Sequence, residues 1–161
     1  MPTEREDQGP AAIARLLEGI PALLEQGHVK EAEEALEAAY RHYTTLSRSL
    51  VAAADADSLA NLLELAQPPP PQLALLADLL EAESFLRLRQ GDEERALHCA
   101  HKALRLYLEA ALHDPELLEP VAQPVAYLAE FLQDESLSDL GVRPSKATAR
   151  RLREYRERFG G

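Results

Sequence analysis

Three side chains near the middle of the chain have the types and the spacing of metal ligands. Glu94, His98 and His101 stand at positions i, i+4 and i+7, which share one face of a helix. Lys102 and Arg105 fall on the same face, and two cations beside the ligands oppose the binding of a dication. We therefore expect this face to be solvated and assign no metal ligand. A helical metal-binding or enzymatic protein that uses the three residues is the alternative.

Other catalytic patterns are weaker. Glu25 and His28 have the Glu-x-x-His spacing of di-iron bundles, but Gly27 ends the helix between them, so the two side chains cannot share a face. Cys99 has no obvious activating base, and a lone helical cysteine is usually a packing residue. The sequence has no phosphate-binding loop, nucleophile elbow or dinucleotide fingerprint. We expect a protein that is not an enzyme and has no cofactor.

Four residues of one predicted helix are candidates for interaction. Glu83 falls within an apolar arc, where a carboxylate is costly unless it is paired. Arg87 follows one turn later, which predicts an ion pair at the edge of the core or, alternatively, a polar point inside a groove. Phe85 and Leu88 project away from the core stripe and need a cover. Another helix of the chain or a two-fold dimer interface would supply that cover.

The C-terminal end of the sequence is a basic segment. Residues 143–161 carry a net charge of +5, whereas the preceding residues sum to −16. Such a segment docks on the acidic body, binds a polyanion or stays a mobile tail, and we favour docking because the body repels nucleic acid and acidic membranes. Its interaction candidates are Arg150, Arg151 and Tyr155. Nucleic acid is an unlikely partner, and we expect no membrane association.

Composition predicts an all-α protein of one domain. The 161 residues are 46% hydrophobic, and most of that content is Leu and Ala rather than β-branched or aromatic residues. The acidic N-terminus does not resemble a signal peptide, and the single cysteine agrees with a reducing compartment. These features predict a cytoplasmic protein. The excess of Arg over Lys suggests a bacterial source with GC-rich DNA.

Helix signals predict about six to seven helices after a disordered leader at 1–9, and the last of them is the basic helix of 143–161, which begins at about Ser145. The signals predict a main domain at 10–142, with Pro21 kinking or breaking its first helix, and a second helix from 28 to 50. Asp55 or Asp57 is the expected N-cap of a third helix. Four consecutive prolines end this helix and are expected to form a stiff corner. The fourth and fifth span 72–90 and 92–113; Pro120 and Pro124 bend or split the sixth.

Two stretches of the chain share one pattern of residues at a constant offset. The matched positions of the first copy and then the second are Leu24, Gln26, Gly27, Ala32, Ala39 and Tyr43, and Leu88, Gln90, Gly91, Ala96, Ala103 and Tyr107. Both copies resemble a tetratricopeptide (TPR) unit, in which a glycine turn joins two helices and small residues lie where they cross. The resemblance implies a right-handed array of antiparallel hairpins. It also implies a protein-interaction or self-association module, expected to be a homodimer, that binds an unidentified protein or peptide.

Overall fold

The computed structural model describes residues 2–134 and 139–160, with side chains from Gly9 onward. These residues form eight α-helices and no strand, so the predicted all-α class is confirmed. The helices are α1 (Pro2–Glu25), α2 (Val29–Arg41), α3 (Arg48–Ala53), α4 (Ala56–Ala66), α5 (Pro70–Arg89), α6 (Glu93–His113), α7 (Leu118–Leu132) and α8 (Lys146–Phe159), with a 3₁₀ turn at Pro115–Leu117. None of the described helices is long and apolar enough to cross a membrane.

Two antiparallel hairpins, α1–α2 and α5–α6, form the frame of the molecule. Their turns have the same backbone, because Gly27 and Gly91 adopt left-handed φ angles of 79° and 80°. In each turn the glycine N–H bonds to the carbonyl three residues back, and the next N–H bonds to the carbonyl five residues back. This pattern is the Schellman helix end, which favours glycine at the left-handed position. The internal repeat of the sequence therefore marks two equivalent turns.

The alanines of the repeat are buried in both hairpins. Ala32, Ala39, Ala96 and Ala103 are fully buried, as the repeat predicts. A side chain of one carbon lets neighbouring helix backbones pack near the short end of the usual range of about 8 to 10 Å between axes. The repeat in the sequence is thus also a repeat in packing.

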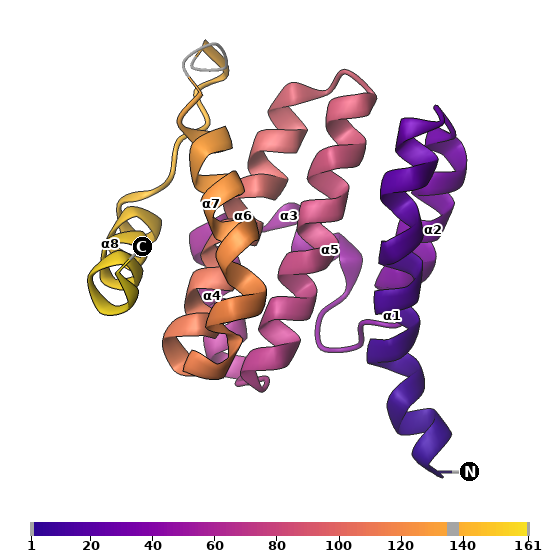
Figure 1. The fold of residues 1–161 in the computed structure, drawn as a ribbon, viewed down its shortest axis with the longest axis horizontal. Helices are drawn as coiled ribbons and strands as arrows, with labels where there is room; N and C mark the ends of the chain where they lie inside the picture. Colours follow the sequence, from indigo (N-terminus) through magenta and orange to yellow (C-terminus); the bar gives the residue numbers. More distant parts are fainter. Residues whose placement is uncertain (1, 135–138, 161) are drawn as a thin grey trace.

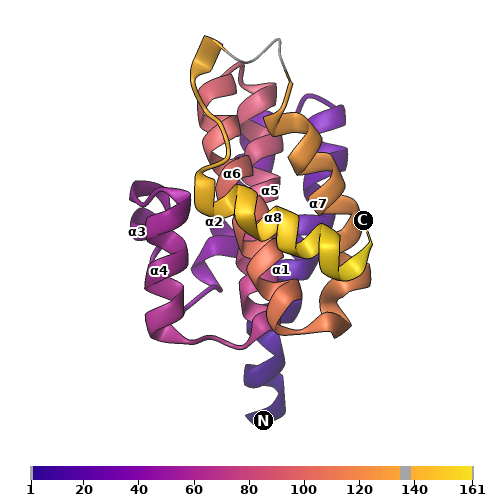
Figure 2. The same ribbon diagram turned by 90° about the vertical axis from the view of Figure 1, so that its left-hand side faces the viewer.

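The helices lie side by side in a row (Figure 1). The α1–α2 hairpin is at one end, α5 and α6 are in the middle, and α7 follows against α6. The short helices α3 and α4 lie behind this row, where α4 contacts α6. Figure 2 shows α8 crossing in front of α6, which it contacts together with α4. The central helices α5 and α6 are consequently buried around most of their circumference.

The predicted helix from 28 to 50 is wrong, because α2 ends at Arg41 and a new helix begins at Arg48. The N–H groups of His42 and Tyr43 bond three residues back, which tightens and ends the helix. Two β-branched threonines follow, and such residues favour helices less than straight-chain ones. The Ser47 hydroxyl then accepts a hydrogen bond from the Leu50 N–H at 3.2 Å and caps α3.

Prolines inside α1 and α7 do not interrupt these helices. Helix α1 spans Pro2–Glu25, which includes most of the segment 1–9. Of the kink or break expected at Pro21, the break does not occur. Helix α7 begins at Leu118, which places Pro120 in the first turn, where a missing N–H costs little. Pro124 lies inside α7 and does not split it. Packing of α1 on α2 and α5, and of α7 on α6, offsets the lost hydrogen bonds.

Predicted helix starts are confirmed where a side chain caps them. Asp55 accepts from the Ser58 N–H at 2.8 Å, and Asp92 accepts from the Arg95 N–H at 3.2 Å. Ser145 does the same for α8, accepting from the Thr148 N–H at 3.1 Å. The proline segment is a corner between α4 and α5, with Pro70 in the first turn of α5.

Candidate functional site: two faces of α5

The possible metal ligands do not come together. Glu94 and His98 are exposed, and their nearest polar atoms are 3.9 Å apart. His101 faces α8 instead: its Nε2 accepts a hydrogen bond from the Ser145 N–H at 3.2 Å and lies 3.0 Å from the Thr148 hydroxyl. No group of three metal-ligating side chains occurs among the described residues. The alternative built on this trio therefore has no support in the geometry.

The expectation that the same helix face is solvated is wrong for Lys102 and Arg105, because α3 and α4 cover it. The Lys102 ammonium donates to the carbonyls of Val51 and Ala52 at 2.9 and 3.1 Å, which completes the C-terminus of α3. Arg105 donates to Asp57 at the start of α4 at 2.7 Å. Lys102 and Arg105 thus bind the short helices α3 and α4 to α6.

Cys99 is buried, as expected for a packing residue. Burial is the main cause that raises the pKa of its thiol to about 12, and the Glu83 carboxylate adds to the rise. A thiol of this kind stays protonated at neutral pH and is a poor nucleophile.

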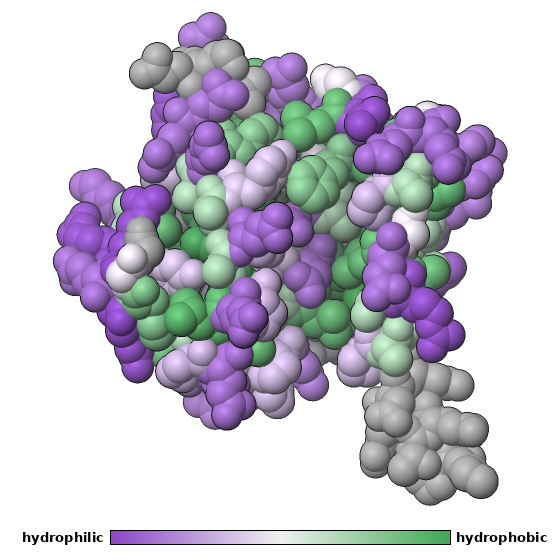
Figure 3. Space-filling model, viewed as in Figure 1, coloured by the Kyte–Doolittle hydropathy of each residue, from purple (hydrophilic) through white to green (hydrophobic). Residues whose placement is uncertain are grey.

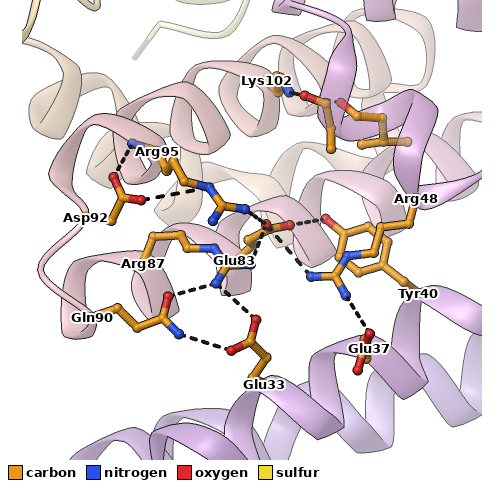
Figure 4. Close-up of polar contacts among 12 residues, drawn as sticks. Glu33, Glu37, Tyr40, Arg48, Glu83, Arg87, Gln90, Asp92, Arg95 and Lys102 are labelled. Atoms are coloured by element: carbon orange, nitrogen blue, oxygen red, sulfur yellow. Dashed lines mark hydrogen bonds and ion pairs between the residues drawn. The ribbon is translucent and has the colours of Figure 1, made fainter.

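The buried Glu83 is the centre of an ion cluster whose members come from α2, α3, α5 and α6 (Figure 4). Its Oε1 accepts a hydrogen bond from the Tyr40 hydroxyl at 2.8 Å, and its Oε2 accepts from Arg87 at 3.1 Å. Two further guanidinium groups, those of Arg48 and Arg95, lie 3.9 Å from the same Oε2. Three cations and one phenol thus surround a single carboxylate.

A second set of bonds ties the cluster to α2. Arg87 also donates to Glu33 at 3.1 Å and to Gln90 at 2.7 Å, and Gln90 in turn donates to Glu33 at 3.1 Å. The Arg48 guanidinium lies over the Tyr40 ring, 4.7 Å from its centroid. The cluster therefore joins the two hairpins through polar contacts as well as through the apolar core.

Glu83 and Arg87 form the ion pair that their spacing predicts, but its position differs from the expectation. The two residues are 7% and 4% exposed, so the pair is buried and not at an edge. The alternative of a polar point in a groove is wrong, because Glu83 faces α2 and α6 and its four polar partners enclose it. Sequence periodicity on α5 cannot show that another helix covers this face.

The opposite face of α5 borders an apolar groove of about 620 Å³. Its walls come from α1, α5 and α7, and they include Leu17, Leu24, Phe85, Leu88 and Tyr127. Figure 3 shows hydrophobic side chains gathered between α7 and α1, with hydrophilic side chains around them. Phe85 and Leu88 are half-buried, so other helices of the same chain cover them in part and leave a hollow beside them.

Aromatic rings continue from this groove along α7. The Phe85 and Tyr127 ring centroids are 5.4 Å apart, and those of Tyr127 and Phe131 are 6.1 Å apart. A second hollow lies beside the first, bordered by Tyr127, Phe131, Glu130 and Asp134. Tyr127 lines both hollows and keeps 41% of its surface exposed.

Two carboxylates of α5 face the apolar groove. Asp78 accepts a hydrogen bond from the buried Tyr107 hydroxyl of α6, and burial raises the pKa of Asp78. Burial also raises the pKa of Glu81 to about 7, and the neighbouring Asp78 charge adds to that rise. Glu81 forms no hydrogen bond or ion pair with any described residue. A half-charged carboxyl group therefore stands in a mostly apolar groove at neutral pH.

Helix α8 is docked on the body, the arrangement that the charge pattern favours. Arg151 donates to Glu109 of α6 at 2.6 Å, and Arg158 donates to the Leu112 carbonyl at 3.0 Å. Tyr155 is buried with Leu152 in the core, whereas Arg150 stays exposed. Arg151 and Tyr155 thus hold the helix in place and are not free for a partner.

Sequence reasoning missed Asp78, Glu81 and Tyr127. Asp78, Glu81 and Phe85 stand at i, i+3 and i+7 on one face of α5, so their spacing contained a signal. Tyr127 has no such signal, because only the packing of α7 brings it to α5. Comparison of the chain with known protein families, curated proteins and solved structures finds no match in any of the three.

Proposed function

We propose that the chain is a non-enzymatic, TPR-like protein-interaction module that holds a segment of another protein in the groove between α1, α5 and α7. The observation that carries this proposal is the groove itself, with Phe85, Leu88 and Tyr127 only partly covered. Partly covered apolar clusters of this kind mark contact sites in folded proteins. The volume of about 620 Å³ lies within the range of pockets that hold ligands.

The two equivalent hairpins support the TPR-like part of the proposal. Their matching glycine turns and buried alanines are the features on which the resemblance rests. A function in binding rather than catalysis agrees with the buried Cys99 thiol and with the separate environments of His98 and His101. A cytoplasmic location agrees with a single thiol that has no partner cysteine.

A substitution that blocks the groove tests this proposal. Leu88→Glu places a charge on its apolar wall, and Leu65→Glu is a matched control on α4, where Leu65 is 85% exposed and outside the groove. Tagged wild-type and Leu65→Glu proteins should retain the same partner from cell extract, and Leu88→Glu should lose it. Recovery of that partner in equal amount by all three proteins would count against the groove.

Self-association is tested in the same experiment. If a second copy fills the groove, light scattering will show a wild-type dimer that Leu88→Glu converts to a monomer. A dimer that persists in Leu88→Glu would place the contact between copies elsewhere. Circular dichroism of both variants checks that each remains folded.

A further inference from the structure

Glu81 differs from Glu83 of the same helix because it forms no ion pair with any cation among the described residues. It lies on the groove side of α5. No described residue donates a hydrogen bond to its carboxylate or forms an ion pair with it. The same helix carries Glu83, which has three guanidinium groups within 3.9 Å. Burial of an unpaired carboxylate costs free energy, and a partner cation would recover it.

Aromatic rings lie beside this carboxyl group. Tyr127 and Glu81 line the same groove. Burial raises the pKa of Tyr127, and the negative charge of Glu81 adds to that rise. A cation that approaches Glu81 from the open side therefore also meets the Tyr127 ring, with Phe85 next to it. Aromatic faces attract ammonium and guanidinium groups, most strongly where water is excluded.

The charges around the groove have one prevailing sign. Asp78, Glu81, Glu18 and Glu25 line it, against one cation, Arg89, among the described lining residues. Glu130 and Asp134 border the neighbouring hollow. A cationic partner is thus attracted along the whole surface, whereas an acidic partner is repelled.

We propose that the groove binds a basic, amphipathic segment of a partner protein, with one lysine or arginine side chain held between Glu81, Asp78 and the ring of Tyr127. Apolar residues of the same segment pack against Leu17 and Leu88, which line the groove and are only half-buried. This inference rests on the proposed function and assigns the chemistry of its partner.

The basic helix α8 of a second copy fits this site poorly. Its apolar residues Leu152 and Tyr155 are buried against their own body, and Arg151 is paired with Glu109. The exposed arginines alone would supply charge without the apolar contacts that the groove offers. The occupant is therefore a segment of a different protein.

The proposal predicts a pH dependence. A bound cation favours the ionised form of Glu81, so binding below pH 7 must release a proton and becomes weaker as pH falls. Affinity should rise between pH 6 and pH 8. The charged groups that line the groove with Glu81 are Asp78, Arg89, Glu18 and Glu25. The titratable phenols of Tyr107 and Tyr127, which interact with Glu81, stay neutral in this range because burial raises their pKa values.

Two short labelled peptides serve as probes: an amphipathic lysine–leucine helix and the same peptide with glutamine at every lysine position. Fluorescence anisotropy gives affinity, and amide NMR shifts give the location. The lysine peptide should shift signals around Phe85 and Tyr127. Glu81→Gln should weaken it about tenfold, the scale of one lost charge-assisted contact of about 1.4 kcal/mol, and should remove the rise with pH.

Glu34→Gln is the matched control, because Glu34 is exposed on α2, outside the groove, and the variant loses the same charge. It should weaken binding less than threefold if attraction to the acidic body is a minor contribution. Equal losses in the two variants would overturn the proposal, as would a glutamine peptide that binds the groove as tightly as the lysine peptide. Each result leaves the Leu88→Glu test of the groove unaffected, so the two proposals can fail separately. Absence of groove shifts with the lysine peptide at millimolar concentration would also overturn the inference.

Discussion

Glu81 and Glu83 are two residues apart on α5, and their carboxylates lie in opposite environments. Glu83 faces inward, where Tyr40 and three arginines enclose it. Glu81 faces the groove and pairs with no cation in the described part of the chain, and burial together with Asp78 raises its pKa to about 7. The comparison separates a carboxylate that joins helices from one that costs free energy in the isolated chain. The proposed binding of a cation rests on this difference between the two carboxylates.

The largest expected effect comes from breaking the Glu83 cluster. Arg87→Met leaves a buried carboxylate with less compensation and should cost about 3 to 5 kcal/mol of unfolding free energy in urea denaturation. The double variant Glu83→Gln with Arg87→Met should cost clearly less than the sum of the two single variants, because it removes both charges. Additive losses would show that the pair is not coupled.

Glu81→Gln should raise the free energy of unfolding, whereas Arg87→Met lowers it. The folded pKa of about 7 lies above the value of an unfolded glutamate, so the folded chain binds the extra proton and wild-type stability falls as pH rises from 4.5 through 7. The variant should therefore be more stable than wild type by about 2 kcal/mol at pH 8, allowing for partial exposure, and equal to it near pH 4.5. A variant that is less stable at pH 8 would give Glu81 a structural role like that of Glu83.

His101 provides a third case, at the contact of α6 with α8. Burial lowers the pKa of this imidazole, with Arg105 and His98 lowering it further and Asp57 and Asp55 opposing them. The folded pKa of His101 lies below the unfolded value. The neutral imidazole therefore contributes fully to the free energy of unfolding above about pH 6.5, and this contribution is lost as pH falls.

Protonation also removes the acceptor for the Ser145 N–H. Wild type should lose about 1 kcal/mol between pH 7 and pH 5 through this contact, the worth of one hydrogen bond, and His101→Gln should not. Thermal melts in the Glu81→Gln background isolate this loss from the opposite trend of Glu81. If the melting temperature depends on pH equally with and without His101, the imidazole does not cause the loss of stability.

The sequence predicts local features well and burial by distant elements poorly. Gly27, Gly91, Asp92 and Ser145 specify turns and helix starts through backbone chemistry within a few residues, and the structure has each of them. The spacing of Glu83 and Arg87 likewise predicts their ion pair.

The failures in predicting burial have one physical cause. Whether Glu83, Lys102 or Arg105 is buried depends on α2, α3 and α4, which are distant along the chain, as the bond between Arg87 and Glu33 shows. The spacing of residues within one helix does not show which distant helices pack against it. The groove is unpredictable for the same reason, because it exists only once α1, α5 and α7 are in place.

The pKa of the Glu81 carboxyl group, followed by NMR titration of its side-chain carbon, tests the central claim most directly. The account predicts a value of about 7 in the free protein and a lower value when the lysine peptide is bound. A value near 4.5 in the free protein, or one that the peptide does not change, would contradict it.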